Sequence, residues 1–249
     1  MSDLHPSTRG FASADLYERG RPDYPAAAVE RIVARLDLRP GRTVLDLAAG
    51  TGKLTRLLVP SKANVIAVEP VREMRTELER HVRGVVALAG TAERIPLTDR
   101  YVDAVTVGQA FHWFKQDEAL REIHRVLQPG GGLALIWNAR DERDPVQAAL
   151  SEVIDPLEGE TPRRRNRDWR SLLPESGLYE RCERALFEHV QVVDEQGLVD
   201  RVVSMSFIAA GPQAVRDEVE ARVRAIARDA EQPIKLPYMT EVYFGYKPD

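Results

Sequence analysis

The chain has 249 residues, of which 43% are hydrophobic and 30% charged, and its formal net charge is −4. This composition is that of a folded globular protein. The slight acidity argues against general binding to nucleic acids or anionic membranes, which needs a basic face. The single cysteine, Cys182, cannot form an internal disulfide, and no apolar run is long enough for a signal peptide or a membrane span. We therefore expect a cytoplasmic protein with no membrane partner.

Short apolar segments alternate with amphipathic segments after a polar N-terminal arm. The arm, residues 1–25, leads into an expected helix at residues 26–38, which Pro40 and Gly41 end. Strands are expected at residues 43–48, 64–68, 85–89, 102–107 and 133–138. Helices are expected at residues 52–59, 71–81 and 117–127. Continuous apolar strands between amphipathic helices predict a parallel sheet that is covered on both faces.

The pattern changes after Asn138. Residues 140–170 are polar, rich in acids and arginines, and are expected to form helix or loop. Later strands are expected at residues 185–193 and 239–246, and later helices at residues 198–210 and 214–228. The two late strands would form an antiparallel hairpin at one edge of the sheet. The predicted fold is therefore α/β: a doubly wound, mostly parallel, Rossmann-like sheet with helices on both faces, an antiparallel edge hairpin and an N-terminal helical arm.

Two glycines, Gly50 and Gly52, follow the first strand in the segment VLDLAAGTG. Ligands of an open parallel sheet bind beyond the carboxyl ends of its strands, and glycine lets the backbone turn tightly and approach a ligand closely. A P-loop is excluded because Gly52-Lys53 is followed by Leu54 rather than by Ser or Thr. A dinucleotide fingerprint is poorly matched because Thr55 stands where a third small residue lets helix and strand pack.

Acidic residues at the ends of the first two strands favour a third ligand, S-adenosylmethionine, which brings no phosphate to the turn. Asp46 would meet its cationic amino-acid part, and Glu69 would accept hydrogen bonds from both ribose hydroxyls. Two alternatives stay open at this point. The turn can be a tight strand-to-helix connection without a ligand, and Glu69 can cap the positive end of the following helix.

Five segments occur in the order and spacing of one enzyme family. They are VLDLAAGTG, VIAVEP, GTAERIPLTDRYVDAV, QAFHWF and EIHRVLQPGGGLALIWN. Together they resemble the class I S-adenosylmethionine-dependent methyltransferases, and the N-terminal ADLYERGRPDYP resembles the small-molecule enzymes of the trans-aconitate type. We expect one methyltransferase domain over residues 1–249. Residues 1–40 would form an arm and helix, 41–138 the cofactor-binding core, and 139–249 a substrate-side insertion and the closure of the sheet.

The resemblance implies S-adenosylmethionine as the cofactor and assigns roles to the residues that match the family's motifs. The positions implied to lie near its methionine part and sulfonium are Asp46, Ala48, Gly50, Gly52 and either Gln109 or Ala110. Glu69 would bind the ribose. Ala92 would offer its backbone N–H to the adenine, with Thr91 or Glu93 beside the exocyclic amine.

This sequence departs from the family's pattern at two places. The usual glycine–cysteine pair before the first motif glycine is Ala48-Ala49 here, and Thr91 replaces the usual acid of the adenine loop. The alanine would narrow the glycine turn. The threonine leaves the contact to the exocyclic amine without its usual acceptor.

The segment QAFHWF follows the fourth strand and opens onto the same end of the sheet. Methyl transfer is an in-line displacement at carbon, so the protein needs chiefly to position the acceptor atom near the methyl group in a dry site. His112 is the candidate general base for a hydroxyl acceptor, whereas a carboxylate acceptor needs no base. Phe111 and Trp113 would line the substrate site. Alternatively, His112 packs among these aromatic residues and bonds to the backbone.

Tyrosines and arginines gather in the N-terminal arm. If the arm closes over the site as a lid, Tyr17 and Arg21 would reach the cofactor's carboxylate or the substrate, and Tyr24 would contact the substrate. The alternative is a solvated arm that Pro22 and Pro25 hold by simple packing.

A basic run at residues 163–170 lies where this fold commonly inserts substrate-contacting elements. Its arginines would suit an acidic substrate. A solvated face neutralised by nearby acids and an RNA-binding surface are the alternatives. The five histidines are scattered along the chain, so no metal site is expected.

The leading functional hypothesis is transfer of a methyl group from S-adenosylmethionine to an O, N or C atom of a small molecule. One alternative is a nicotinamide-dependent (NAD) oxidoreductase, and another is a module that binds S-adenosylmethionine without catalysis. We expect a small-molecule partner and no nucleic acid.

Overall fold

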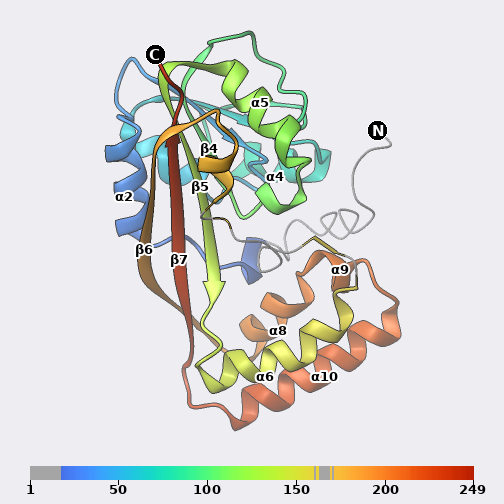
Figure 1. Ribbon diagram of the computed structural model, residues 1–249. Helices are drawn as coiled ribbons and strands as arrows, with labels where there is room; N and C mark the ends of the chain where they lie inside the picture. Colours follow the sequence, from blue (N-terminus) through green and yellow to red (C-terminus); the bar gives the residue numbers. More distant parts are fainter. Residues whose placement is uncertain (1–17, 160, 163–168, 170) are drawn as a thin grey trace. The chain divides into compact units, whose positions relative to one another are not determined.

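The computed structural model describes residues 18–159, 161–162, 169 and 171–249, and the chain divides into two compact units (Figure 1). The first, here called the sheet unit, comprises Tyr24–Asn138, Pro162–Phe187 and Thr240–Asp249. The second, the helical unit, comprises Met1–Asp23, Ala139–Thr161 and Glu188–Met239.

Among the described residues, seven strands form one sheet in the order β3-β2-β1-β4-β5-β7-β6. Their bounds are β1 Thr43–Leu47, β2 Asn64–Val68, β3 Val86–Leu88, β4 Val102–Gly108, β5 Leu127–Arg140, β6 Glu180–Val193 and β7 Ile234–Tyr246. β1 pairs in parallel with β2 and β4, β2 with β3, and β4 with β5. An antiparallel pair closes one edge, so the predicted fold class is confirmed. The strand order reverses between β1 and β4, which is where open α/β sheets bind ligands.

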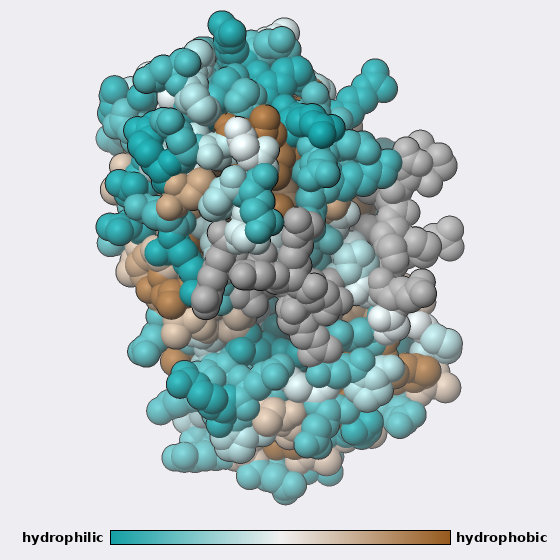
Figure 2. Space-filling model, viewed as in Figure 1, coloured by the Kyte–Doolittle hydropathy of each residue, from teal (hydrophilic) through white to brown (hydrophobic). Residues whose placement is uncertain are grey.

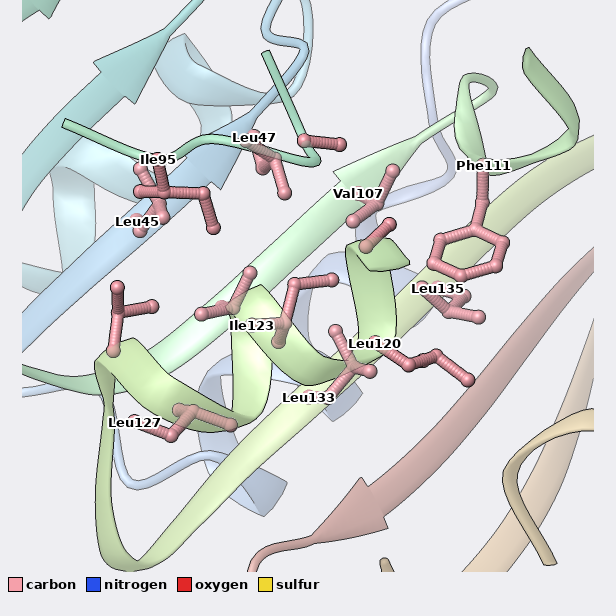
Figure 3. Packing of buried hydrophobic residues seen from close by; sticks show 14 of the residues in the cluster. Leu45, Leu47, Ile95, Val107, Phe111, Leu120, Ile123, Leu127, Leu133 and Leu135 are labelled. Atoms are coloured by element: carbon pink, nitrogen blue, oxygen red, sulfur yellow. The ribbon is translucent and has the colours of Figure 1, made fainter. Parts of the chain in front are cut away.

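The helices of the sheet unit connect its strands. They are α2 Ala26–Arg35, α3 Thr55–Leu58, α4 Arg72–His81, α5 Gln116–Val126 and α7 Leu172–Glu175, with short 3₁₀ turns η2 Val59–Ser61 and η3 Phe111–Trp113. Successive residues of a strand face opposite sides of a sheet. Leu45 of β1 accordingly joins a cluster with Leu120 of α5 (Figure 3), whereas Val44 joins a second cluster with Ile32 of α2. Helices therefore cover both faces of the sheet.

The helical unit contains a core of its own. Its helices are α6 Pro145–Ile154, α8 Glu195–Val203, α9 Ser206–Ala209 and α10 Gln213–Asp229, with the 3₁₀ turn η4 Asp155–Leu157. Leu150, Val202 and Val223, from three of these helices, share one hydrophobic cluster. Asp144 caps α6 by accepting the Gln147 N–H at 2.9 Å, and Asp194 caps α8 in the same way. Such caps satisfy amides that have no partner within the helix.

The viewed face of the protein is largely hydrophilic with small apolar patches (Figure 2). In the part of the chain that the structure describes, no helix combines the length and the hydrophobicity that crossing a membrane requires.

Most predicted elements form near their expected bounds, and β2 forms over the expected residues 64–68. Two predicted helices are wrong in detail. The helix expected to begin at Gly52 begins at Thr55, because Gly52 has a φ of +87°, outside the helical region. The helix expected over residues 198–210 is split into α8 and α9.

Strand β5 begins six residues earlier than the expected 133. No strand is expected over Pro129 and the three glycines that follow it, but Leu127 already pairs with Val102. The register then shifts before Gly132 pairs with Ala104, as at a β-bulge. The glycines accommodate that irregularity, since a Cβ at position 131 would lie 2.9 Å from the carbonyl oxygen of Asp103.

Candidate active site

The glycine turn joins β1 to α3 beside the end of β2. Three of its residues have positive φ: Ala48 at 54°, Gly50 at 58° and Gly52 at 87°. The Ala49 N–H donates to the carbonyl of Val68, the last residue of β2, at 3.1 Å. The turn is therefore held against the carboxyl end of β2 as well as following that of β1.

Position 52 requires glycine, whereas position 48, which also has a positive φ, is occupied by alanine. A Cβ on Gly52 would lie 2.9 Å from Val82 and 3.0 Å from Leu78, so a side chain there would displace the packing beside α4. Ala48 adopts a left-handed backbone conformation that disfavours residues with a Cβ. The sequence departure at position 48 therefore introduces backbone strain into the turn.

The Glu69 carboxylate links the glycine turn to the segment after β2. One oxygen accepts the Gly50 N–H at 2.9 Å and the other accepts the Val71 N–H at 2.9 Å. Arg75 of α4 donates to the Glu69 carbonyl at 2.7 Å. Burial raises the pKa of Glu69 to about 7, against the lowering effect of the two amide donors and Arg75. Glu69 thus lies beside the glycine turn, as the ribose hypothesis predicts, and it also contacts the segment that leads into α4, as a helix cap would.

Asp46 is buried beneath the turn, and hydroxyl groups hold its carboxylate. Thr55 of α3 donates to one oxygen at 2.6 Å, and Thr106 of β4 donates to the other at 3.0 Å. Burial raises the pKa of Asp46 to about 6, although both hydroxyls favour the charged form. The two threonines were not predicted. In the sequence, Thr55 stands out only as a departure from a dinucleotide fingerprint, and nothing singles out Thr106.

The predicted adenine loop follows β3 as a tight turn. The Arg94 N–H donates to the Thr91 carbonyl at 3.2 Å, and Ala92 is buried in the cluster that α5 covers. The Glu93 carboxylate accepts the backbone N–H of Lys115, just before α5, at 2.9 Å. Glu93 therefore fixes the loop to α5. The adenine roles of Thr91, Ala92 and Glu93 stay predictions.

The end of β4 brings two further predicted residues together. Gln109 has a φ of 57° and its side-chain amide lies 3.5 Å from the Asn138 carbonyl of β5. Tyr24 is buried against the preceding residue, since a Cβ on Gly108 would lie 2.6 Å from the Tyr24 hydroxyl. The structure thus places Tyr24, which precedes α2, at the carboxyl end of a central strand.

The aromatic segment after β4 contributes differently at each position. Phe111 is fully buried and contacts Phe114 and Trp169 edge-on (Figure 3 shows Phe111). His112 is half-buried, and its Nδ1 accepts a long hydrogen bond of 3.4 Å from the Trp137 indole N–H. This contact puts the proton of a neutral ring on Nε2. Trp113 is also half-buried, so its predicted role in substrate binding stays a prediction.

Of the remaining predicted residues, most lie outside the described part of the chain, and Arg21 belongs to the helical unit. Tyr17 lies outside the described residues, as do all positions of the basic run at 163–170 except Trp169. Trp169 is buried, with its ring 5.0 Å from that of Trp137. Arg21 belongs to the helical unit and donates to the Ser204 carbonyl at 3.4 Å. Within the described residues, no group of His, Cys, Asp and Glu side chains has the arrangement of a metal site.

Comparison with known proteins identifies the family. The family described as "Methyltransferase domain" matches residues 45–135. An uncharacterized methyltransferase of Mycobacterium tuberculosis is 41% identical over 240 residues, which are 92% of this chain and 92% of that protein. The chain belongs to the class I S-adenosylmethionine-dependent methyltransferases.

A second relative agrees with this methyltransferase assignment, and a solved structure shows the same fold. A methyltransferase-like protein of Schizosaccharomyces pombe is 32% identical over 237 residues, covering 93% of this chain and 92% of that protein. A solved structure of a candidate type II methyltransferase from Anaeromyxobacter dehalogenans has a TM-score of 0.65 at 22% identity. It covers 92% of this chain and 99% of that chain, and it shows the same fold. Membership of the trans-aconitate subgroup stays a prediction.

Replacing Ala48 by glycine should stabilise the methyltransferase. Glycine adopts the positive φ of position 48 without a Cβ clash, so we expect Ala48→Gly to raise the free energy of unfolding by about 1 kcal/mol. Ala49→Gly is the matched control, since Ala49 has no positive φ, and it should lower stability by about 0.5–1 kcal/mol. Urea denaturation measures both, and equal effects of the two substitutions would contradict the assigned strain.

The buried Asp46 carboxylate should make the cofactor-free methyltransferase less stable as pH rises. Its folded-state pKa of about 6 is above its unfolded value, so its contribution is present at low pH and is lost as pH rises through 6. Between pH 5 and pH 8 we expect the wild type to lose about 1 kcal/mol relative to Asp46→Asn. Urea denaturation at the two pH values measures this difference. Identical pH dependence in both proteins would show that Asp46 titrates normally.

Proposed function

We propose that the protein transfers the methyl group of S-adenosylmethionine to an O, N or C atom of a small molecule. The proposal is carried by the Glu69 carboxylate, which follows β2 and accepts the N–H of Gly50 in the glycine turn. A single buried acid therefore lies between the two segments that this family uses for the ribose and the methionine part of the cofactor.

Glu69 retains acceptor capacity for a ribose. A carboxylate offers about four acceptor positions on its two oxygens. Each Glu69 oxygen accepts one backbone N–H, from Gly50 or Val71. A further lone pair on each oxygen is thus available for the two ribose hydroxyls, and the amide contacts fix the carboxylate's orientation before binding.

The charge around the turn favours S-adenosylmethionine over NAD. Asp46 and Glu69 are both buried, and the negative charge of Asp46 contributes to raising the pKa of Glu69, after the larger effect of burial. A diphosphate placed at this turn would add negative charge beside two buried carboxylates. A ligand with ammonium and sulfonium groups would instead offset their charge.

For catalysis, the chain has chiefly to position the acceptor atom relative to the methyl group of the cofactor. Bound S-adenosylmethionine would supply an electrophilic methyl group whose sulfonium leaves as a neutral thioether. The chain must hold the acceptor atom in line with that methyl group and exclude water. Gln109, after β4, and the aromatic residues 111–114 are the segment that would flank the methionine part and the acceptor.

His112 can serve as a base only in the less favoured tautomer. The Trp137 contact leaves the proton on Nε2, so proton acceptance at Nε2 requires that contact to be given up. The contact is long, and its loss costs about 1 kcal/mol. General-base catalysis by His112 is therefore energetically accessible, and it is needed only for a hydroxyl or similar acceptor.

Binding and turnover test the proposal directly. Isothermal titration of the full chain with S-adenosylhomocysteine and with NAD should show binding of the first alone. Transfer of a labelled methyl group to a panel of small phenols and carboxylates should then identify the acceptor. Binding of NAD without S-adenosylhomocysteine would overturn the proposal. Binding of S-adenosylhomocysteine without turnover over a broad panel would support the non-catalytic module instead.

Glu69→Ala should weaken S-adenosylhomocysteine binding by about 1–3 kcal/mol, because hydrogen bonds to a charged group are lost. In the wild type, affinity should also fall below pH 7, since the ribose needs the ionised carboxylate and the pKa of Glu69 is about 7. Isothermal titration across this pH range measures both effects. Unchanged affinity in Glu69→Ala would mean that the acid serves only as a cap.

His112→Ala should lower kcat about 100-fold for a hydroxyl acceptor while leaving S-adenosylhomocysteine affinity unchanged. With a carboxylate acceptor, kcat should change little, because no proton is removed. Steady-state kinetics with both acceptor classes provide the comparison. Equal activity of wild type and variant on a hydroxyl acceptor at every pH would assign His112 to packing.

A further inference from the structure

One arginine of α4 holds the segment that joins β2 to this helix. The Nη1 atom of Arg75 donates to the Glu69 carbonyl at 2.7 Å and to the Pro70 carbonyl at 3.0 Å. Each terminal nitrogen of a guanidinium carries two hydrogens, so Nη1 can make both bonds. Arg75 is half-buried, and all three residues belong to the sheet unit. The guanidinium therefore fixes two successive carbonyls of the segment from the side of α4.

The bond to Pro70 also determines where the next amide points. The Pro70 carbonyl and the Val71 N–H belong to one planar trans peptide unit, so they point in opposite directions. Because Arg75 holds the carbonyl on one side, the N–H is directed to the other side, where it donates to the Glu69 carboxylate at 2.9 Å. Arg75 thus acts on this carboxylate through the amide that orients it.

Other elements hold the remaining groups of Glu69. Its backbone N–H donates to the Leu88 carbonyl of β3 at 3.0 Å, and its second carboxylate oxygen accepts the Gly50 N–H at 2.9 Å. The backbone of Glu69 is therefore held between β3 and α4. Its carboxylate is held between the glycine turn and the segment that Arg75 fixes.

Two charged groups act on the Glu69 carboxyl in opposite directions. Arg75 from α4 lowers its pKa, and Asp46 from β1 raises it, both to a smaller extent than burial raises it. Hydrogen bonds from ribose hydroxyls need the ionised carboxylate. The positive charge of Arg75 therefore favours the binding form of Glu69, in addition to the geometric effect of its two hydrogen bonds.

We infer that Arg75 is a positioning residue for the methyl donor, an inference that rests on the proposed function. Through the carbonyls of Glu69 and Pro70, its guanidinium holds the Glu69 carboxylate in the orientation that accepts both ribose hydroxyls. Hydrogen bonds weaken steeply when the donor and the acceptor are misaligned. The ligand that depends on Arg75 is accordingly a nucleoside with free 2′- and 3′-hydroxyls.

Calorimetric titration of the full chain with S-adenosylhomocysteine tests the positioning role. At pH 9, two units above the Glu69 pKa of about 7, we expect Arg75→Met to weaken binding about tenfold. Arg72→Met is the matched control, because Arg72 is an exposed arginine of the same helix, and it should bind as the wild type does. Wild-type affinity in Arg75→Met would overturn the inference.

A double-mutant cycle separates positioning from general damage to α4. If Arg75 acts through Glu69, adding Arg75→Met to Glu69→Ala should change S-adenosylhomocysteine affinity by less than about twofold. Equal losses of affinity with and without Glu69 would mean that Arg75 only supports the helix, and the inference would be wrong.

The pH dependence of binding is a second readout, which a merely structural role would not change. Removing the positive charge of Arg75 raises the pKa of Glu69, so the loss of affinity on acidification should begin at higher pH in Arg75→Met than in the wild type. Arg75→Lys keeps the charge and should retain the wild-type profile. If Arg75→Met fails to fold, Arg75→Gln, which keeps an NH2 donor without the charge, should show the same shift. An unshifted profile in the uncharged variant would contradict the inference.

The behaviour of the wild type keeps this inference apart from the proposed function. If the wild type binds S-adenosylhomocysteine and the Arg75 variants bind it equally well, only the positioning role is refuted. If the wild type does not bind S-adenosylhomocysteine, the methyl-transfer proposal itself is refuted.

Discussion

The Glu69 carboxylate joins two backbone segments on which the candidate site depends. It accepts amides from Gly50 in the glycine turn and from Val71 ahead of α4, so the ends of β1 and β2 are fixed to each other. Parallel strands bring their carboxyl ends to one edge of a sheet, but the sheet alone does not set the orientation of the turns that follow. The buried Glu69 carboxylate sets this orientation, because each of its oxygens accepts one particular backbone amide. The same carboxylate retains lone pairs for a ligand.

Burial of negative charge accompanies this arrangement. Asp46 lies under the turn, satisfied by two threonine hydroxyls, and both carboxyl groups have pKa values raised by burial. The burial of these two carboxylates and the left-handed backbone of Ala48 both lower the stability of the turn when no cofactor is bound. A cationic ligand relieves part of that cost, so binding and stability should be coupled here.

The sequence by itself determined the doubly wound sheet, the glycine turn and the acid after β2, because these depend on local hydrophobic periodicity and on short motifs. It predicted the strand at 64–68 directly, but it placed the start of β5 at 133, since the glycines that permit a β-bulge resemble those of a loop. Only the tertiary structure decided which groups meet across the chain. Thr55 and Thr106 reach Asp46 from two elements, and Arg201 of α8 donates to the hydroxyl of Tyr238 in β7. Such contacts depend on packing between distant segments, and no local pattern of residues encodes them.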